Sequence, residues 1–242
     1  MQVTLKKSIS NGSIDNVVVL CNSLSVLDNC PISTEEIKYI GDNLPSAGAK
    51  LYVFNRLEYF TMVCYYNSSD KALETHQTLR TEAKKLHGIL VENNISEVSV
   101  VGSEGVSADD FLAYSEALIL SSYTFDKYKT KKGSKLDNIT LVSETIQQGD
   151  IDKLMNICSS VFACRDWVNE PIAELNAETF ANVLQEHCNG LEIKTTVLNQ
   201  QQIEALGMGG ILAVNKGSQD EARFVVLEWK PGNAVNTQPI AL

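Results

Sequence analysis

Short runs of β-branched and aromatic residues alternate with helix-like stretches, and this alternation is the feature that most limits how the chain can fold. Such runs are typical of strands. Before residue 145 the expected strands are Val3–Lys6, Val17–Cys21, Lys50–Phe54, Tyr59–Tyr65, Val98–Val101 and Ile139–Val142. Because helical segments separate them, the sequence predicts an α/β domain built on a mixed sheet.

The stretches between these runs carry helix signals. Ser33 and Glu36 have the spacing of a capping box, and Gly41 is the expected stop of that helix. A second helix is expected over residues 70–94, and a third from the cap Ser107 through Leu120. The apolar face of the second helix is expected to hold Leu73, Leu79, Ala83, Leu86 and Leu90.

A change in pattern near residue 149 divides the chain. A long helix is expected from there, and Pro171 ends it because the residue before a proline avoids helical geometry. Asn176 then caps a helix over 177–188. The last expected elements are a strand at 191–198, a helix at 200–206, and strands at 210–214, 224–229 and 240–242. We therefore predict an N-terminal α/β domain at 1–148, a linking helix at 149–171, and the beginning of a second α/β domain at 172–242.

Composition places the chain among globular proteins, with 44% hydrophobic and 21% charged residues. A formal net charge of -10 disfavours binding to nucleic acid or to an anionic membrane, because counterion release rewards cationic surfaces. The N-terminal charges are not followed by an apolar signal region, and no run of about 18 apolar residues occurs. The six cysteines form no CxxC pair. These features predict a protein of the reducing cytoplasm.

The histidines do not have the spacing of metal ligands. His76 and His87 are eleven residues apart on one expected helix, which separates them by roughly 16 Å along its axis. His187 and Cys188 are neighbours on a helix and diverge by about 100°. We expect His76 and His87 at the surface or at the edge of the core, and we expect His187 and Cys188 to make a poor chelate.

Paired carboxylates begin two of the expected helices. Asp109 and Asp110 lie in one first turn and Asp150 and Asp152 in another, where negative charge complements the helix dipole. This role is favoured over catalysis. No HExxH motif, nucleophile elbow or Walker loop occurs in the sequence.

Two local stretches leave a binding role open. In "VSVVGSEGVSADDF", Gly102, Gly105 and Ser107 could bring N–H groups to a phosphate, but Glu104 and the following aspartates oppose an anion, and a plain turn is the alternative. In "LGMGGILAV" the glycines are expected only to stop a helix and to start a strand.

A lysine-rich stretch, "FDKYKTKKGSK", could bind single-stranded nucleic acid through charge and stacking. A solvated loop with an aromatic anchor is the alternative, and the acidic chain favours it. The residues concerned are Lys127, Lys129, Lys131, Lys132 and Lys135, with Tyr123, Phe125 and Tyr128.

Four stretches occur in the order and spacing of a known family: "SEALILSSYTFDKYKTKK", "CRDWVNEPIAELNAETFA", "LGMGGILAVNKGSQDEARFVVLEWKP" and "PIAL". From about residue 112 onward the chain resembles the leucyl aminopeptidase (cytosol aminopeptidase) family. It departs from the family after "VNEP", where Ile172, Ala173, Asn176 and Ala177 replace the usual Asn and Thr-Pro.

The resemblance implies an N-terminal domain similar to the macro fold, a connecting helix and a peptidase domain. It also implies a cytoplasmic, hexameric enzyme that uses two divalent metal ions, zinc or manganese, to remove N-terminal residues, often leucine, from peptides. The family's metal ligands follow its "PIAL" strand, in segments like VGKG, DTGG and NTDAEGR. No residue of this sequence matches them. We therefore assign no catalytic, cofactor-binding or metal-binding residue, and expect no cofactor in this chain.

The final run "PIAL", residues 239–242, is expected to be a core strand at which the chain is cut, leaving it inactive by itself. Two other readings remain open. One is a macro-like binding module that takes a nucleotide or an ADP-ribose-type ligand at Gly102 to Ser107. The other is an assembly or regulatory subunit that docks on a complete homologue.

Overall fold

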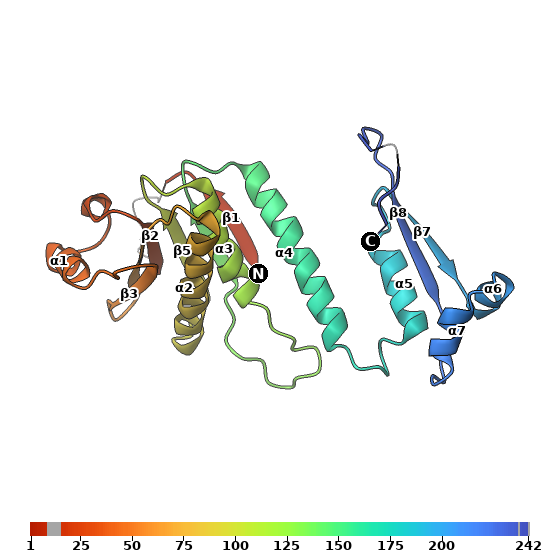
Figure 1. The fold of residues 1–242 in the computed structure, drawn as a ribbon. Coiled ribbons are helices and arrows are strands. Elements are labelled where there is room, and N and C mark those ends of the chain that lie inside the picture. Colours follow the sequence, from red (N-terminus) through yellow and green to blue (C-terminus); the bar gives the residue numbers. More distant parts are fainter. Residues whose placement is uncertain (9–15, 237, 242) are drawn as a thin grey trace. The chain divides into compact units, whose positions relative to one another are not determined.

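The chain forms two compact units, Met1–Arg165 and Asp166–Leu242. The structure is a computed structural model and describes residues 1–8, 16–236 and 238–241. Both units combine helices and strands (Figure 1). The boundary between them lies within one long helix, and the domain bounds expected from the sequence stay predictions.

A six-stranded mixed sheet is the framework of the first unit, with strand order β1-β6-β5-β2-β4-β3. Five strands are parallel, and β3 pairs antiparallel with β4. The mixed α/β sheet expected from the sequence is confirmed. The strands are β1 (Gln2–Lys6), β2 (Val17–Cys21), β3 (Ala49–Asn55), β4 (Phe60–Tyr66), β5 (Glu97–Gly102) and β6 (Asn138–Val142).

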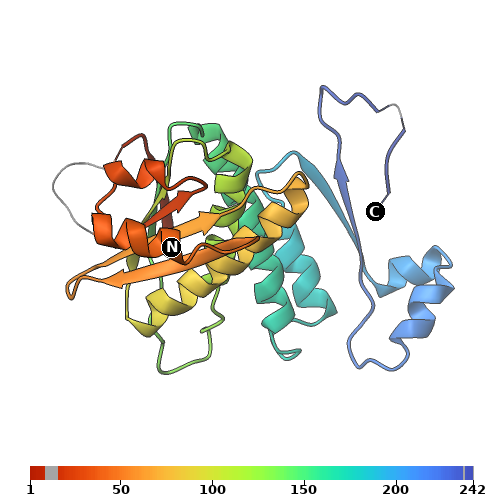
Figure 2. The ribbon, with the colours of Figure 1, turned by 60° about the vertical axis from the view of Figure 1, so that its left-hand side comes forward.

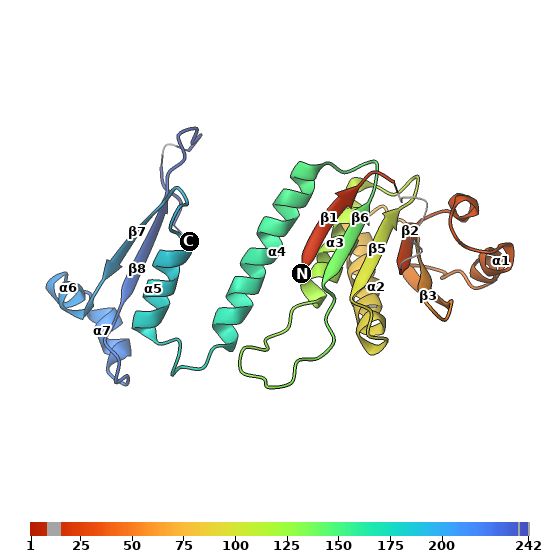
Figure 3. The same ribbon diagram turned by 180° about the vertical axis from the view of Figure 1, so that it is seen from behind.

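Helices lie on both faces of this sheet. They are the 3-10 helix η1 (Ser25–Asn29), α1 (Thr34–Asp42), α2 (Ala72–Glu92), α3 (Ala108–Ser121) and α4 (Gln148–Asn169). Side chains of α2, α3 and α4 share one core cluster with Val18 and Leu20 of β2. The alternate residues of β2, Val19 and Cys21, share a second cluster with side chains of η1 and α1. Figure 2 shows η1 and α1 across the strands from α2, and Figure 3 shows β1, β6 and β5 in front of α2 and α3.

Two details of these helices differ from the sequence expectations. Gly41 lies inside α1, which ends at Asp42. Leu73 is 77% exposed, so its placement on the apolar face of α2 is wrong. At about 100° per residue, Leu73 lies some 120° around the helix from Leu79, and Thr75 is buried in its stead. The other four expected core residues of that face are buried.

The second unit contains a small antiparallel sheet and three helices beyond the end of α4. They are α5 (Ala177–His187), β7 (Ile193–Leu198), α6 (Gln200–Ala205), α7 (Gly209–Asn215) and β8 (Phe224–Trp229). Strands β7 and β8 pair from Ile193 opposite Trp229 to Leu198 opposite Phe224.

Two expected strands of this unit are not formed. Residues 210–214 belong to α7, because an apolar run of this length fits a strand and a short helix equally well. Gly207 turns the chain between α6 and α7 with a φ of +66°. Ile240 and Ala241 lie outside any strand, and Ile240 is 74% exposed. A strand needs a backbone partner, and within the described residues β8 pairs only with β7; Leu242 lies outside them.

None of the helices in the described part of the chain is long and apolar enough to cross a membrane.

Candidate functional site

The carboxyl ends of β2, β4 and β5 meet at one edge of the large sheet, at Cys21, Tyr66 and Gly102. Ligands of open α/β sheets bind at this kind of edge. Helix α3 begins beside it after a short loop, and the Ser107 hydroxyl caps the helix by accepting the N–H of Asp110 at 3.1 Å. This edge is therefore the candidate ligand-binding edge of the first unit.

The loop between β5 and α3 is packed onto its neighbours. The N–H of Ser103 donates to the carbonyl of Leu20 at 3.0 Å, and that of Val106 donates to Ser103 at 3.2 Å. The side-chain amide of Asn22 donates to the carbonyl of Gly105 at 3.0 Å. Gly105 has a φ of +85°, which favours glycine. Two N–H groups of the loop are thus already engaged in hydrogen bonds to backbone carbonyls.

A polar network joins α2, α3 and β4 next to this loop. The Tyr66 hydroxyl donates to Oδ2 of Asp110 at 3.0 Å, and Nε2 of His76 lies 3.3 Å from Oδ1 of the same carboxylate. Burial and the nearby Asp110 carboxylate raise the pKa of Tyr66, so this phenol stays protonated and donates. Asp109 and Asp110 lie in the first turn of α3, as expected.

A cleft of about 270 Å³ opens between α2, α3 and α4 beside this network. Its floor is apolar and its rim is charged. Here the floor denotes the apolar lining residues Leu112, Ala113, Leu154 and Ile157, and the rim denotes the polar and charged lining residues His76, Arg80, Asp109, Glu116, Asp150 and Lys153. On the rim, Nε and Nη2 of Arg80 both donate to Oε2 of Glu116, at 3.1 and 2.8 Å.

The other two histidines are His87 on α2 and His187 on α5. Burial lowers the pKa of His87, which is half-buried on α2. His187 meets the Trp167 ring edge-on at 5.3 Å between centroids. Within the described residues, no group of three or more His, Cys, Asp or Glu side chains could hold a metal ion.

Part of the lysine-rich stretch is neutralised by Asp126. Lys135 pairs with this carboxylate, and Lys129 lies 3.8 Å from it. The hydrogen bond from Lys135 lowers the pKa of Asp126. The rings of Tyr123 and Phe162 stack with their centroids 5.6 Å apart. Such a contact is the aromatic anchor expected if the stretch is a solvated loop.

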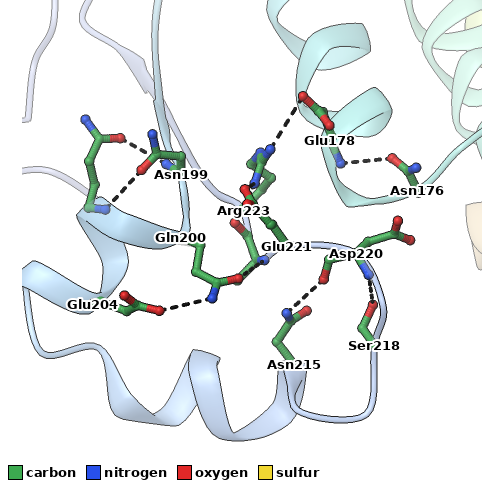
Figure 4. A network of polar contacts seen from close by, with 12 residues as sticks. Asn176, Glu178, Asn199, Gln200, Glu204, Asn215, Ser218, Asp220, Glu221 and Arg223 are labelled. Atoms are coloured by element: carbon green, nitrogen blue, oxygen red, sulfur yellow. Dashed lines mark hydrogen bonds and ion pairs between the residues drawn. The ribbon is translucent and has the colours of Figure 1, made fainter.

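In the second unit, a polar network connects the helices to the chain that enters β8 (Figure 4). Arg223 is its centre, with a side chain only 13% exposed that pairs with Glu221 at 3.0 Å and with Glu178 at 3.5 Å. Asn176 caps α5 by accepting the N–H groups of Glu178 and Thr179 at 3.1 and 3.0 Å. Sequence reasoning did not single out Arg223, although it lies within one of the four family-like stretches.

Figure 4 also shows how the loop before β8 is held. The side-chain amide of Asn215 donates to the carbonyl of Asp220 at 3.0 Å. The N–H of Ala222 donates to the side-chain oxygen of Gln200 at 3.4 Å. These hydrogen bonds hold the loop against α6 and α7. The network therefore helps to position β8, which begins directly after the loop.

Comparison with known proteins relates the second unit to a known family. The model of the cytosol aminopeptidase family, catalytic domain, matches residues 162–242. The "Probable cytosol aminopeptidase" of Clostridium tetani is 32% identical over 135 residues, which is 52% of this chain and 27% of that protein. Its counterpart in Geobacter sulfurreducens is 34% identical over 137 residues, covering 54% of this chain and 28% of that protein. The matched part is therefore less than a third of these relatives.

Solved structures show the same fold over nearly the whole chain. A tomato leucine aminopeptidase mutant matches with a TM-score of 0.74 and 13% identity. This match covers 97% of the present chain and 52% of the tomato enzyme's chain. The bottromycin maturation enzyme BotP, solved in complex with Mn, matches with a TM-score of 0.68 and 16% identity. This match covers 91% of the present chain and 46% of the BotP chain. At these identities the likeness concerns the fold. Together with the sequence matches, it shows that this chain is similar to the cytosol aminopeptidase family, in sequence over about half of its length and in fold over nearly all of it.

Proposed function

We propose that the chain is part of a metal-dependent aminopeptidase, a hydrolase that removes N-terminal residues, often leucine, from peptides. The observation that carries the proposal is the match of the family's catalytic-domain model to residues 162–242. The curated relatives, named as cytosol aminopeptidases, support it over about half of the chain.

The metal chemistry is proposed to reside in polypeptide that these 242 residues do not include. A pair of divalent ions, zinc or manganese, would activate water and polarise the scissile carbonyl. Such a centre needs several ligands converging within about 2 to 2.5 Å of each ion. The described residues do not fit it, because they hold no group of three or more candidate ligands. We therefore expect the chain alone to be inactive.

The proposal gives the first unit a structural role in assembly and in shielding the active site. It includes a cytoplasmic location and a hexameric assembly, as the family resemblance implies. In the second unit, the Arg223 network positions β8 and the segment that follows it. Correct placement of this segment matters because the family's metal-binding residues come directly after it.

The rival proposal, an anion-binding module at Gly102 to Ser107, is less well supported. Two N–H groups of that loop already donate to backbone carbonyls. Glu104 and Asp109 are exposed at the same place and would repel a phosphate. Calorimetry with ADP-ribose tests this module directly, and we expect no heat of binding.

A chimera tests the aminopeptidase proposal. Residues 1–242 are joined to the part of the Clostridium tetani relative that follows its matched segment. We expect the chimera to hydrolyse Leu-p-nitroanilide in the presence of Mn²⁺. Chelation with 1,10-phenanthroline should abolish this activity and fresh Mn²⁺ should restore it. The intact relative serves as the positive control.

A chimera that folds and binds manganese but leaves the substrate uncleaved would contradict the proposal. Folding is checked by circular dichroism and assembly by light scattering, so that this result is separated from simple misfolding.

A further inference from the structure

We propose that the cleft between α2, α3 and α4 is a binding site for a free α-amino acid with an aliphatic side chain. This site lies in the first unit, and the proposal stands on the chemistry of the cleft alone. It goes beyond the proposed peptidase function, which assigns no ligand to this unit.

The charges of the rim select a zwitterion. Arg80 and Glu116 neutralise each other through two short hydrogen bonds. Asp150, also on the rim, accepts the N–H of Gln147 at 2.9 Å. Lys153 on α4 and Asp109 on α3 remain, and in the described structure neither forms an ion pair within 4 Å. One ammonium and one carboxylate that face the same cleft complement a ligand carrying both charges.

The floor selects an apolar side chain. Ala113 and Leu154 are buried, whereas Ile157 is 55% exposed. A branched aliphatic group seated on Leu112 and Ile157 would remove this exposed surface from water, at roughly 25 cal/mol per Å². Glycine, which has the same two charges, would gain nothing from the floor.

Size and charge exclude larger anions. About 270 Å³ lies just below the range of roughly 300 to 1,000 Å³ typical of pockets for drug-sized ligands. A nucleotide would also bring its phosphates against Asp109, Glu116 and Asp150. A single amino acid is smaller, and it carries only one anionic group, which can pair with Lys153.

The expected pose follows from the elements. The ligand carboxylate pairs with Lys153 on α4, and the ligand ammonium pairs with Asp109 at the start of α3. Because the cleft is open and both partners are at the surface, each pair adds modestly to affinity, and we expect millimolar binding.

Titration of the ¹⁵N-labelled 242-residue chain with L-leucine tests the site. We expect saturable chemical-shift changes at amides of α3 and α4 around the cleft. Three analogues dissect recognition: 4-methylpentanoate lacks the ammonium, 3-methylbutylamine lacks the carboxylate, and glycine lacks the side chain. Each should bind at least about fivefold more weakly than leucine.

Two substitutions in the cleft provide a second test of leucine binding. Lys153→Met and Asp109→Asn should each weaken leucine binding about fivefold, since each removes one surface ion pair. The matched controls Lys84→Met on α2 and Asp152→Asn on α4 remove the same charges outside the cleft lining and should leave binding unchanged.

The proposal is overturned if leucine produces no saturable shifts, if glycine binds as well as leucine, or if the cleft variants bind like the controls. None of these measurements involves peptide hydrolysis, so the site and the proposed function can fail separately.

Discussion

At the scale of single residues, two glycines illustrate opposite consequences of adding one methyl group. A Cβ on Gly102 would lie 2.8 Å from Cδ2 of Phe111, a ring that is fully buried. A Cβ on Gly88, inside α2, would meet nothing within 4 Å. We expect Gly102→Ala to lower the free energy of unfolding by about 1 to 3 kcal/mol through overpacking.

Gly88→Ala is the matched control for that change, and it should raise the free energy of unfolding by about 0.5 to 1 kcal/mol, because alanine favours a helix interior over glycine. Urea denaturation of both variants measures the two effects. Equal effects of the same sign would show that the close contact between Gly102 and Phe111 does not govern stability.

Glu36 gives a prediction about pH. Burial acts to raise the pKa of this carboxyl, but hydrogen bonds from the Arg56 guanidinium at 2.5 Å and the Ser33 N–H at 2.9 Å outweigh it and hold the pKa below its usual value. A carboxyl with a lowered folded-state pKa stabilises the protein above its unfolded-state pKa of about 4.3. That contribution is lost as the pH falls through the folded-state pKa.

We therefore expect Glu36→Gln to be less stable than the parent chain at pH 7, and to lose less stability between about pH 5 and pH 3. Thermal denaturation across this pH range measures the difference. Glu35→Gln, a neighbouring and exposed carboxylate, is the control. Parallel pH profiles for the parent and the Glu36 variant would refute the interpretation.

At the scale of elements, the cap of α5 can be tested. Asn176 accepts two backbone N–H groups, and its own N–H donates to the hydroxyl of Thr179 at 2.8 Å. Asn176→Ala should destabilise α5 by about 1 kcal/mol. Hydrogen exchange at the first-turn amides should then accelerate roughly fivefold, whereas Asn236→Ala, at an exposed position, should not change it. Unchanged exchange in the Asn176 variant would mean that the cap contributes nothing to the helix.

Most elements follow from local signals in the sequence. The predicted bounds of β2 and β8 coincide with the observed ones, because β-branched residues in these runs are flanked by turn residues. The helices α1 and α5 begin at the predicted caps, since a capping box needs only residues three apart.

The failures occur where local signals do not decide. The apolar run of α7 fits a helix or a strand, and its neighbours determine which one forms. Residues 239–241 have the composition of a strand but pair with nothing in the described structure. An apolar run is therefore necessary for a buried strand without being sufficient.

The candidate site could not be predicted from local patterns. The network of Tyr66, His76 and Asp110 joins three elements that are distant in sequence. The cleft likewise exists only because α2, α3 and α4 pack on the same face of the sheet. Its charged residues were visible in the sequence as helix-dipole partners, but their grouping around an apolar floor was not.

At the scale of the whole molecule, two kinds of likeness cover different parts of the chain. The catalytic-domain model begins at residue 162, whereas the fold of a solved leucine aminopeptidase covers 97% of the chain. The structural likeness thus extends over the first unit as well as the second.

The central claim is that these 242 residues supply family architecture and not the dinuclear metal chemistry. Its most direct test is Leu-p-nitroanilide hydrolysis by the purified chain in excess Mn²⁺ or Zn²⁺, with bound metal measured by equilibrium dialysis. The account predicts no turnover above the buffer rate and less than one tightly bound ion per chain. Turnover together with two bound ions per chain would contradict it.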